Sequence, residues 1–143
     1  MSDEPVPGRA LLHPVALSCL GLMVLNDQVL KWACPGVLTG KLSDVAGLVF
    51  FPLLLVSVWE WSAWLAGRPP HAPRAVVWGA VVFTASGFAA IQVSEVAAWA
   101  WTWGLGLLQA PIRGTWQPVV HTMDPTDLIA LPAAGVALIL TRE

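Results

Sequence analysis

Ten polar side chains in this chain could form a binding site, and most of them stand near the ends of long apolar stretches. They are Asn26, Asp27, Lys31, Lys41, Asp44, Glu95, Arg113, His121, Asp124 and Asp127. The basic members would bind the anionic part of a ligand, and the aspartates would bind its cationic or hydroxyl part. We therefore take these ten residues as candidate ligand-binding residues.

The short motifs that contain these residues also have structural explanations. Asp27 and Lys31 are four residues apart, the spacing of an ion pair on one helical face. The Ser43-Asp44 pair suits the first turn of a helix, where a hydroxyl or carboxylate caps free N–H groups. The run Asp124–Asp127 has the residue types of a helix start, with Asp124 as the N-cap, Pro125 in the first helical position and Asp127 in the capping-box position. Both explanations stay open at each motif.

The rest of the chain predicts the elements that position these residues. Of its 143 residues, 57% are hydrophobic and 11% are charged, whereas a soluble domain has about 25% charged residues. Residues 45–58 and 75–91 lack the polar stripe of a water-facing helix, and a membrane-spanning helix needs about 20 apolar residues. We therefore predict an all-α integral membrane bundle of four transmembrane helices in a single domain, residues 1–143. The spans are expected near 12–31, 44–66, 75–96 and 125–141.

This topology also predicts sidedness. It puts both termini and the 67–74 loop on one side of the membrane, and the loops near 32–43 and 97–124 on the other. The first side has four basic residues and the second has three, so the positive-inside rule favours cytoplasmic termini in a cell membrane. All nine tryptophans fall near span ends, where indole rings prefer the headgroup region. The candidate residues would then converge into one polar pocket at the non-cytoplasmic face. The carboxylates expected to converge from four different spans are Asp27, Asp44, Glu95 and Asp127.

Residues 97–112 are uncharged as well, so a fifth span is an alternative to the four-span topology. A fifth span would need a tight turn before this stretch, but no Gly or Pro occurs between Gly87 and Gly104. We therefore predict that the third helix extends beyond the bilayer and breaks at Gly104-Leu105-Gly106. The remainder, to Met123, would form an interfacial segment or a lid.

Three functions fit this arrangement. The leading one is a binding protein whose outward pocket holds a polar lipid headgroup or a small charged ligand, with membrane lipids as partners and neither cofactor nor metal. The second is an enzyme acting on lipid-linked substrates, with His121 or Glu95 as general base and a divalent cation on the carboxylates. The third is a non-catalytic assembly subunit of an envelope complex. With a net charge of −2 and no basic patch, the chain is not expected to bind nucleic acid.

Two short stretches, Lys41–Pro52 and Asp124–Gly135, resemble the VanZ-like group of small multi-pass bacterial membrane proteins. In that group a Lys followed by a polar residue opens one span, and an Asp-rich start opens a last span rich in Ala and Gly. The matching residues here are Lys41 with Asp44, and Asp124 with Asp127. A His is usual after the early Lys, and Asp44 stands nearest to its place. The resemblance implies a bacterial cell membrane and a role in the cell envelope or in glycopeptide resistance.

Overall fold

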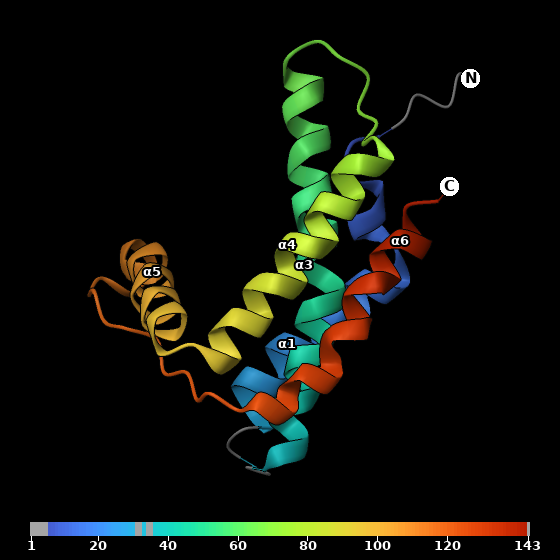
Figure 1. Cartoon of the computed structure of the whole chain (residues 1–143). Helices are drawn as coiled ribbons and strands as arrows, with labels where there is room; N and C mark the ends of the chain where they lie inside the picture. The colour runs from blue at the N-terminus through green and yellow to red at the C-terminus, as the bar shows by residue number, and fades with distance from the viewer. Residues whose placement is uncertain (1–5, 31–32, 34–35, 143) are drawn as a thin grey trace.

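The structure is a computed structural model that describes residues 6–30, 33 and 36–142, without the side chains of residues 27, 37 and 38. Helices make up most of the described residues, and no strand occurs among them, which confirms the all-α class. In chain order the elements are η1 (Arg9–Leu12), α1 (Pro14–Leu25), η2 (Asn26–Leu30), α3 (Val37–Leu65), α4 (Arg74–Val93), α5 (Glu95–Arg113), η3 (Pro125–Gly135) and α6 (Val136–Leu140). Figure 1 shows them in the whole chain.

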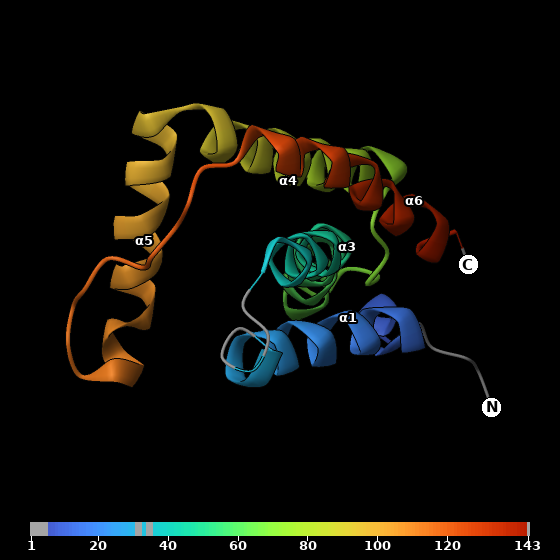
Figure 2. The same ribbon diagram turned by 90° about the horizontal axis from the view of Figure 1, so that it is seen from below.

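The central helix is α3, and α1, α4 and η3 pack against it (Figures 1 and 2). The core between these elements contains Leu48 and Leu53 from α3 and Val81 from α4. The flanking elements contribute small buried side chains, which are Ala16, Ala130, Ala134 and Ala137. Small side chains let helix backbones approach one another closely. Direct contacts among α3, α4 and η3 therefore set where the candidate site residues lie.

Two helical stretches are long and apolar enough to cross a membrane, Thr39–Leu65 and Arg74–Val93. At about 1.5 Å per residue they extend about 40 and 30 Å, against a hydrocarbon core of about 30 Å. The predicted first and last spans correspond to shorter apolar helical stretches, Pro14–Leu30 and Pro125–Leu140. The structure thus provides two helices of spanning length, and the four-span topology stays a prediction.

The predicted extension of the third helix is wrong. The helix α4 ends at Val93, and Ser94 has extended backbone angles (φ −123°, ψ 118°). The Ser94 side chain accepts a hydrogen bond from the backbone N–H of Ala97, so it is the N-cap of a new helix, α5. Glu95 then lies in the first turn of α5, where a negative charge is favourable. A serine cap, rather than a Gly or Pro, makes this break.

The predicted break at Gly104-Leu105-Gly106 does not occur, because all three residues lie inside α5. This helix runs across the direction of α1 and α4 (Figure 2). It ends at Gly114, whose positive φ of 70° is the left-handed conformation that suits a C-terminal glycine cap. The chain then turns back toward η3.

The helix start predicted at Asp124 is confirmed. The Asp124 carboxylate accepts a hydrogen bond from the backbone N–H of Thr126, and Pro125 is the first residue of η3. The backbone N–H of Asp124, which a capping box would bond to Asp127, donates instead to the side-chain oxygen of Gln92 at 3.0 Å. The side chain of Asp127 is therefore available for other contacts.

Candidate functional site

The centre of the candidate site is a contact between the start of α3 and the start of η3. The Lys41 ammonium group donates to Asp127 Oδ1 at 2.5 Å and to Thr126 Oγ1 at 2.8 Å. It also lies 4.0 Å from Asp124 Oδ2. The side chain of Asp127 is only 13% exposed, so this charge pair is shielded from solvent on most sides. Two helix starts thus bring together residues that are more than eighty positions apart in the chain.

Gln92, from the last turn of α4, connects α4 to the pair of Lys41 and Asp127. Its amide nitrogen donates to Asp127 Oδ2 at 3.3 Å, and its amide oxygen accepts from the backbone N–H of Asp124 at 3.0 Å. The residue is buried, and both ends of its amide are satisfied by η3 or its cap. Gln92 was not among the ten candidates, although it lies, like Asn26, at the end of an apolar stretch. Thr126 was not a candidate either.

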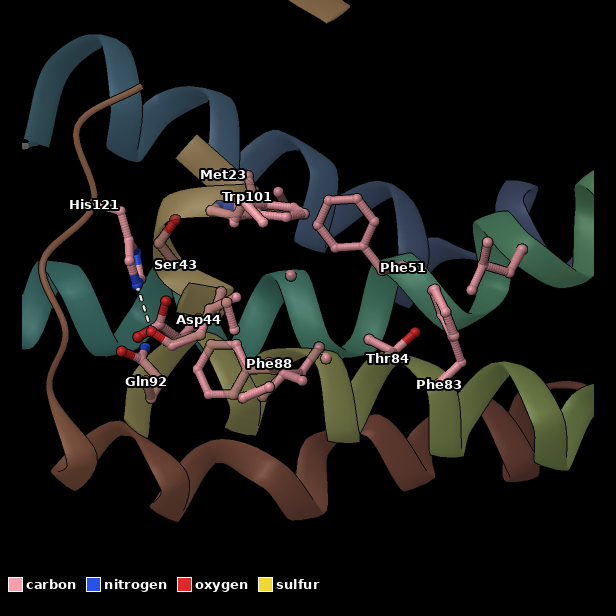
Figure 3. Close-up of a pocket in the computed structure, with 18 residues that line it drawn as sticks. Met23, Ser43, Asp44, Phe51, Phe83, Thr84, Phe88, Gln92, Trp101 and His121 are labelled. Atoms are coloured by element: carbon pink, nitrogen blue, oxygen red, sulfur yellow. Dashed lines mark hydrogen bonds between the residues drawn. The ribbon is translucent and has the colours of Figure 1, made fainter. Parts of the chain in front are cut away.

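Asp44 and His121 extend the site. Ser43 and Asp44 lie inside α3, which begins at Val37, and not in its first turn. Asp44 lies one turn after Lys41, near the Asp127 carboxylate and His121. The Nε2 atom of His121 donates to the backbone oxygen of Ile91 at 3.0 Å. Figure 3 shows His121, Asp44 and Gln92 gathered at one end of a pocket. We call the following residues the polar cluster: Lys41, Asp44, Gln92, His121, Asp124, Thr126 and Asp127.

His121 is positioned by residues 114–124, which we call the return segment. This segment runs back beside α5, and the backbone N–H of Val119 donates to the oxygen of Thr102 at 3.0 Å. The rings of Trp103 and Trp116 are 4.8 Å apart between their centroids. Gly106 is needed for this close approach, because a Cβ atom there would lie 2.2 Å from the oxygen of Gln117. Gly106 therefore allows the return segment to reach the end of α4.

A cleft of about 670 Å³ opens from the polar cluster and runs between α3 and α4. Its large apolar side chains are Met23, Leu48, Phe51, Leu55, Phe83, Phe88 and Trp101. Asp44, Gln92 and His121 line one end (Figure 3). Apart from the hydroxyl of Thr84, the deeper wall is apolar. The volume lies within the about 300–1,000 Å³ of small-molecule sites.

Local hydrogen bonds set the charge of one member of the cluster. The hydroxyl of Thr126 donates to the Asp124 carboxylate at 2.7 Å, and the backbone N–H of Thr126 adds a second bond. These bonds stabilise the ionised form and hold the pKa of Asp124 below its ordinary value, with a smaller contribution from Lys41. Asp124 is therefore an anion at neutral pH.

The remaining candidate residues are not brought into the polar cluster. Glu95 and Arg113 are exposed at opposite ends of α5, and no hydrogen bond or ion pair joins either to another described side chain. Asn26 is fully buried in η2, and its side-chain amide has no hydrogen-bond partner among the described residues. The side chain of Asp27 and the whole of Lys31 lie outside the described residues. Of the four carboxylates expected to converge, the structure brings Asp44 and Asp127 together.

The arrangement favours binding of a positively charged or hydrogen-bonding group. Three carboxylates surround one ammonium group, and the Lys41 charge is already paired with Asp127. Within residues 6–30, 33 and 36–142, no group of three or more His, Cys, Asp or Glu side chains is arranged to hold a metal ion. Asp44 thus provides a carboxylate acceptor at the polar end of an apolar cleft, with Asp124 and Asp127 in the same cluster.

Comparison with known proteins does not place the chain in a family. Protein-family models, curated proteins and solved structures were all searched, and none matches it. The resemblance of Lys41–Pro52 and Asp124–Gly135 to VanZ-like proteins stays a prediction from the sequence. The residues named above are therefore the whole basis for assigning a function.

Proposed function

We propose that this chain is a multi-pass protein of the cell membrane whose polar cluster binds a polar lipid headgroup or a small charged ligand at the non-cytoplasmic face. The observation that supports binding is the polar cluster itself, which opens into a cleft of about 670 Å³. A simple structural ion pair would need only Lys41 and Asp127. Here a second carboxylate, Asp44, and a histidine, His121, line the same opening.

The exposed surface supports a membrane setting. Large apolar side chains point away from the core on α1, α3 and α4, including Leu17 (50% exposed), Trp61 (47%) and Val82 (58%). Contiguous apolar surface of this kind is costly in water and favourable in lipid. The two helices of spanning length, α3 and α4, include the residues on both sides of the cleft.

The last apolar stretch, Pro125–Leu140, supports a further span although it has only 16 residues. Its first 11 residues form the 3-10 helix η3, which rises about 2.0 Å per residue instead of about 1.5 Å. Together with the five α-helical residues of α6, the stretch extends about 30 Å. This length equals the hydrocarbon thickness of a typical bilayer, about 30 Å.

Reporter fusions test the topology. We expect a fluorescent protein fused after Pro70 to fluoresce in the cytoplasm and alkaline phosphatase fused after Gln117 to be active outside. Exchanging the two reporters is the control, because each should then be silent. Activity of the same reporter at both positions would place the 67–74 loop and the return segment on one side, and would overturn the topology.

Ligand binding is tested with soluble headgroup compounds on the purified full chain in a neutral detergent. We expect glycerophosphoethanolamine to raise the unfolding temperature in a concentration-dependent way, and more than glycerol phosphate does, because a ligand that binds only the folded state stabilises it. The Asp44→Asn variant should lose this shift, and Glu60→Gln, at the opposite end of α3, should keep it. No shift with either compound, or an equal shift in Asp44→Asn, would contradict the proposal.

A further inference from the structure

We infer that the cleft is a slot for one lipid of the outer leaflet, with an amine-bearing headgroup at the polar cluster and one acyl chain between α3 and α4. This inference rests on the proposed function, because it names the class of ligand for the same site. It adds two statements that the proposed function does not contain. The ligand has a hydrocarbon chain, and the group at the polar cluster is a cation.

The depth of the cleft supports the acyl chain. On α3 the cleft extends from Asp44 to Leu55, which is about 16 Å along the helix axis. One leaflet of a bilayer has a hydrocarbon depth of about 15 Å, half of the total of about 30 Å. Asp44 at headgroup depth therefore places Leu55 near the middle of the bilayer, so the cleft matches the depth that one acyl chain occupies.

The wall of the cleft supports the same occupant. Below the polar end, Phe51, Phe83 and Phe88 face the cleft from α3 and α4 (Figure 3). Side chains of this kind offer no hydrogen bonds, so water inside the deep half would lose its partners. A hydrocarbon chain fills such a space without that loss. A purely polar ligand would leave the deep half of the cleft unfilled.

The charge of the polar cluster supports the amine. Lys41 is paired with Asp127, whereas Asp44 faces the cleft and Asp124 lies beside the pair. An ammonium group at this end of the cleft would find the Asp44 carboxylate as an acceptor, and a headgroup with only negative charge would be repelled by the carboxylates of the cluster. An aminophospholipid such as phosphatidylethanolamine therefore fits, and phosphatidylglycerol does not.

Native mass spectrometry of the full chain in a neutral detergent tests the inference. The probes are phosphatidylethanolamine and phosphatidylglycerol with identical dioleoyl chains, together with soluble glycerophosphoethanolamine. We expect phosphatidylethanolamine to bind at least about tenfold more tightly than either of the others, a factor equal to about 1.4 kcal/mol. In a series of lysophosphatidylethanolamines, affinity should rise with chain length until the chain reaches the depth of the cleft.

Two glycine variants on α4 make a matched pair. Gly87 lines the cleft, and a Cβ atom there meets nothing within 4 Å, so Gly87→Leu would fill the space for the chain. Gly79 is equally open but does not line the cleft. We expect Gly87→Leu to weaken phosphatidylethanolamine binding at least about tenfold without changing glycerophosphoethanolamine binding, and Gly79→Leu to change neither.

The outcomes separate this inference from the proposed function. Equal binding of the soluble headgroup and the lipid, with no effect of chain length or of Gly87→Leu, would overturn the acyl-chain slot and leave headgroup binding intact. Equal binding of phosphatidylglycerol would overturn the amine. If no probe bound, or if Asp44→Asn bound them all as the native chain does, the proposed function would fail together with the inference.

Discussion

The two ends of the helical bundle use their polar residues in different ways. At the end near the termini, Glu60 accepts from the backbone N–H of Gly8 at 2.8 Å and Arg74 donates to the backbone oxygen of Leu138 at 3.3 Å. At the other end, side chains bond to side chains from three elements. Glu60 and Arg74 each tie a backbone group of a distant segment to a helix end. A cluster with more carboxylates than cations keeps acceptors for a ligand.

The cavities at the two ends reflect this difference. The cavity near the termini has a volume of about 440 Å³ and is lined by polar residues that include Arg9, Glu60 and Thr141. The cleft at the polar cluster is larger and combines a polar mouth with an apolar wall. Stability and ligand binding should therefore respond differently to mutations at the two ends.

The largest effect is expected from Asp127→Ala. This change removes an acceptor from both Lys41 and the buried amide of Gln92, although Lys41 keeps its bond to Thr126. Hydrogen bonds to charged groups contribute about 1.5–3 kcal/mol each, and we expect a loss of about 2–3 kcal/mol in unfolding free energy. A denaturant titration in mixed micelles measures it. Asp127→Asn, which keeps one side-chain oxygen as an acceptor, should lose less; an equal loss would contradict the role of these bonds.

The next effect is expected from Gly106→Ala, which tests how the return segment positions His121. The new methyl group would collide with the oxygen of Gln117, so the segment must move away from α5. We expect a loss of about 1–2 kcal/mol and faster hydrogen exchange at the Val119 amide. Gly104→Ala is the control, because nothing lies within 4 Å of a Cβ atom there. Similar exchange rates in both variants would show that the close approach does not hold the segment.

A smaller effect is expected from Glu60→Ala at the opposite end. It leaves the buried N–H of Gly8 without its acceptor, and we expect a loss of about 1 kcal/mol. Binding of soluble headgroup compounds should not change, because Glu60 is not part of the polar cluster. If Glu60→Ala abolished that binding, the difference between the two ends would not exist.

The smallest effect is a pH dependence at the polar end. The Thr126 hydrogen bonds lower the pKa of Asp124 in the folded state, so its carboxylate contributes stability above the pKa of the unfolded chain. This contribution is lost as the pH falls through the lowered folded pKa, below about pH 4. In the Asp124→Asn variant, the free energy of unfolding should depend less on pH in this range and should keep the pH dependence of the native chain at higher pH. If the pH dependence of stability were the same in Asp124→Asn and in the native chain, the loss of stability in acid would come from other carboxylates.

Part of the fold and part of the site could be predicted from local patterns. The apolar stretches predicted helices, and the run from Asp124 predicted a helix start, because capping depends on residues within one turn. The break at Ser94 was missed, since a serine between apolar residues is compatible with a continuing helix as well as with a cap. The position of Gln92 placed it at the same face as the candidate residues, but it was not among the ten, because an isolated amide has no motif until its partners are known.

The sequence by itself determined that the chain is helical and strongly apolar, and that its polar residues lie at the ends of apolar stretches. These properties follow from composition and from neighbours a few positions apart. Only the tertiary structure decided that Lys41 meets Asp127, that Glu95 stays apart and that parts of α3 and α4 line a cleft. Those features depend on helix packing, in which small alanines on η3 bring distant segments into contact.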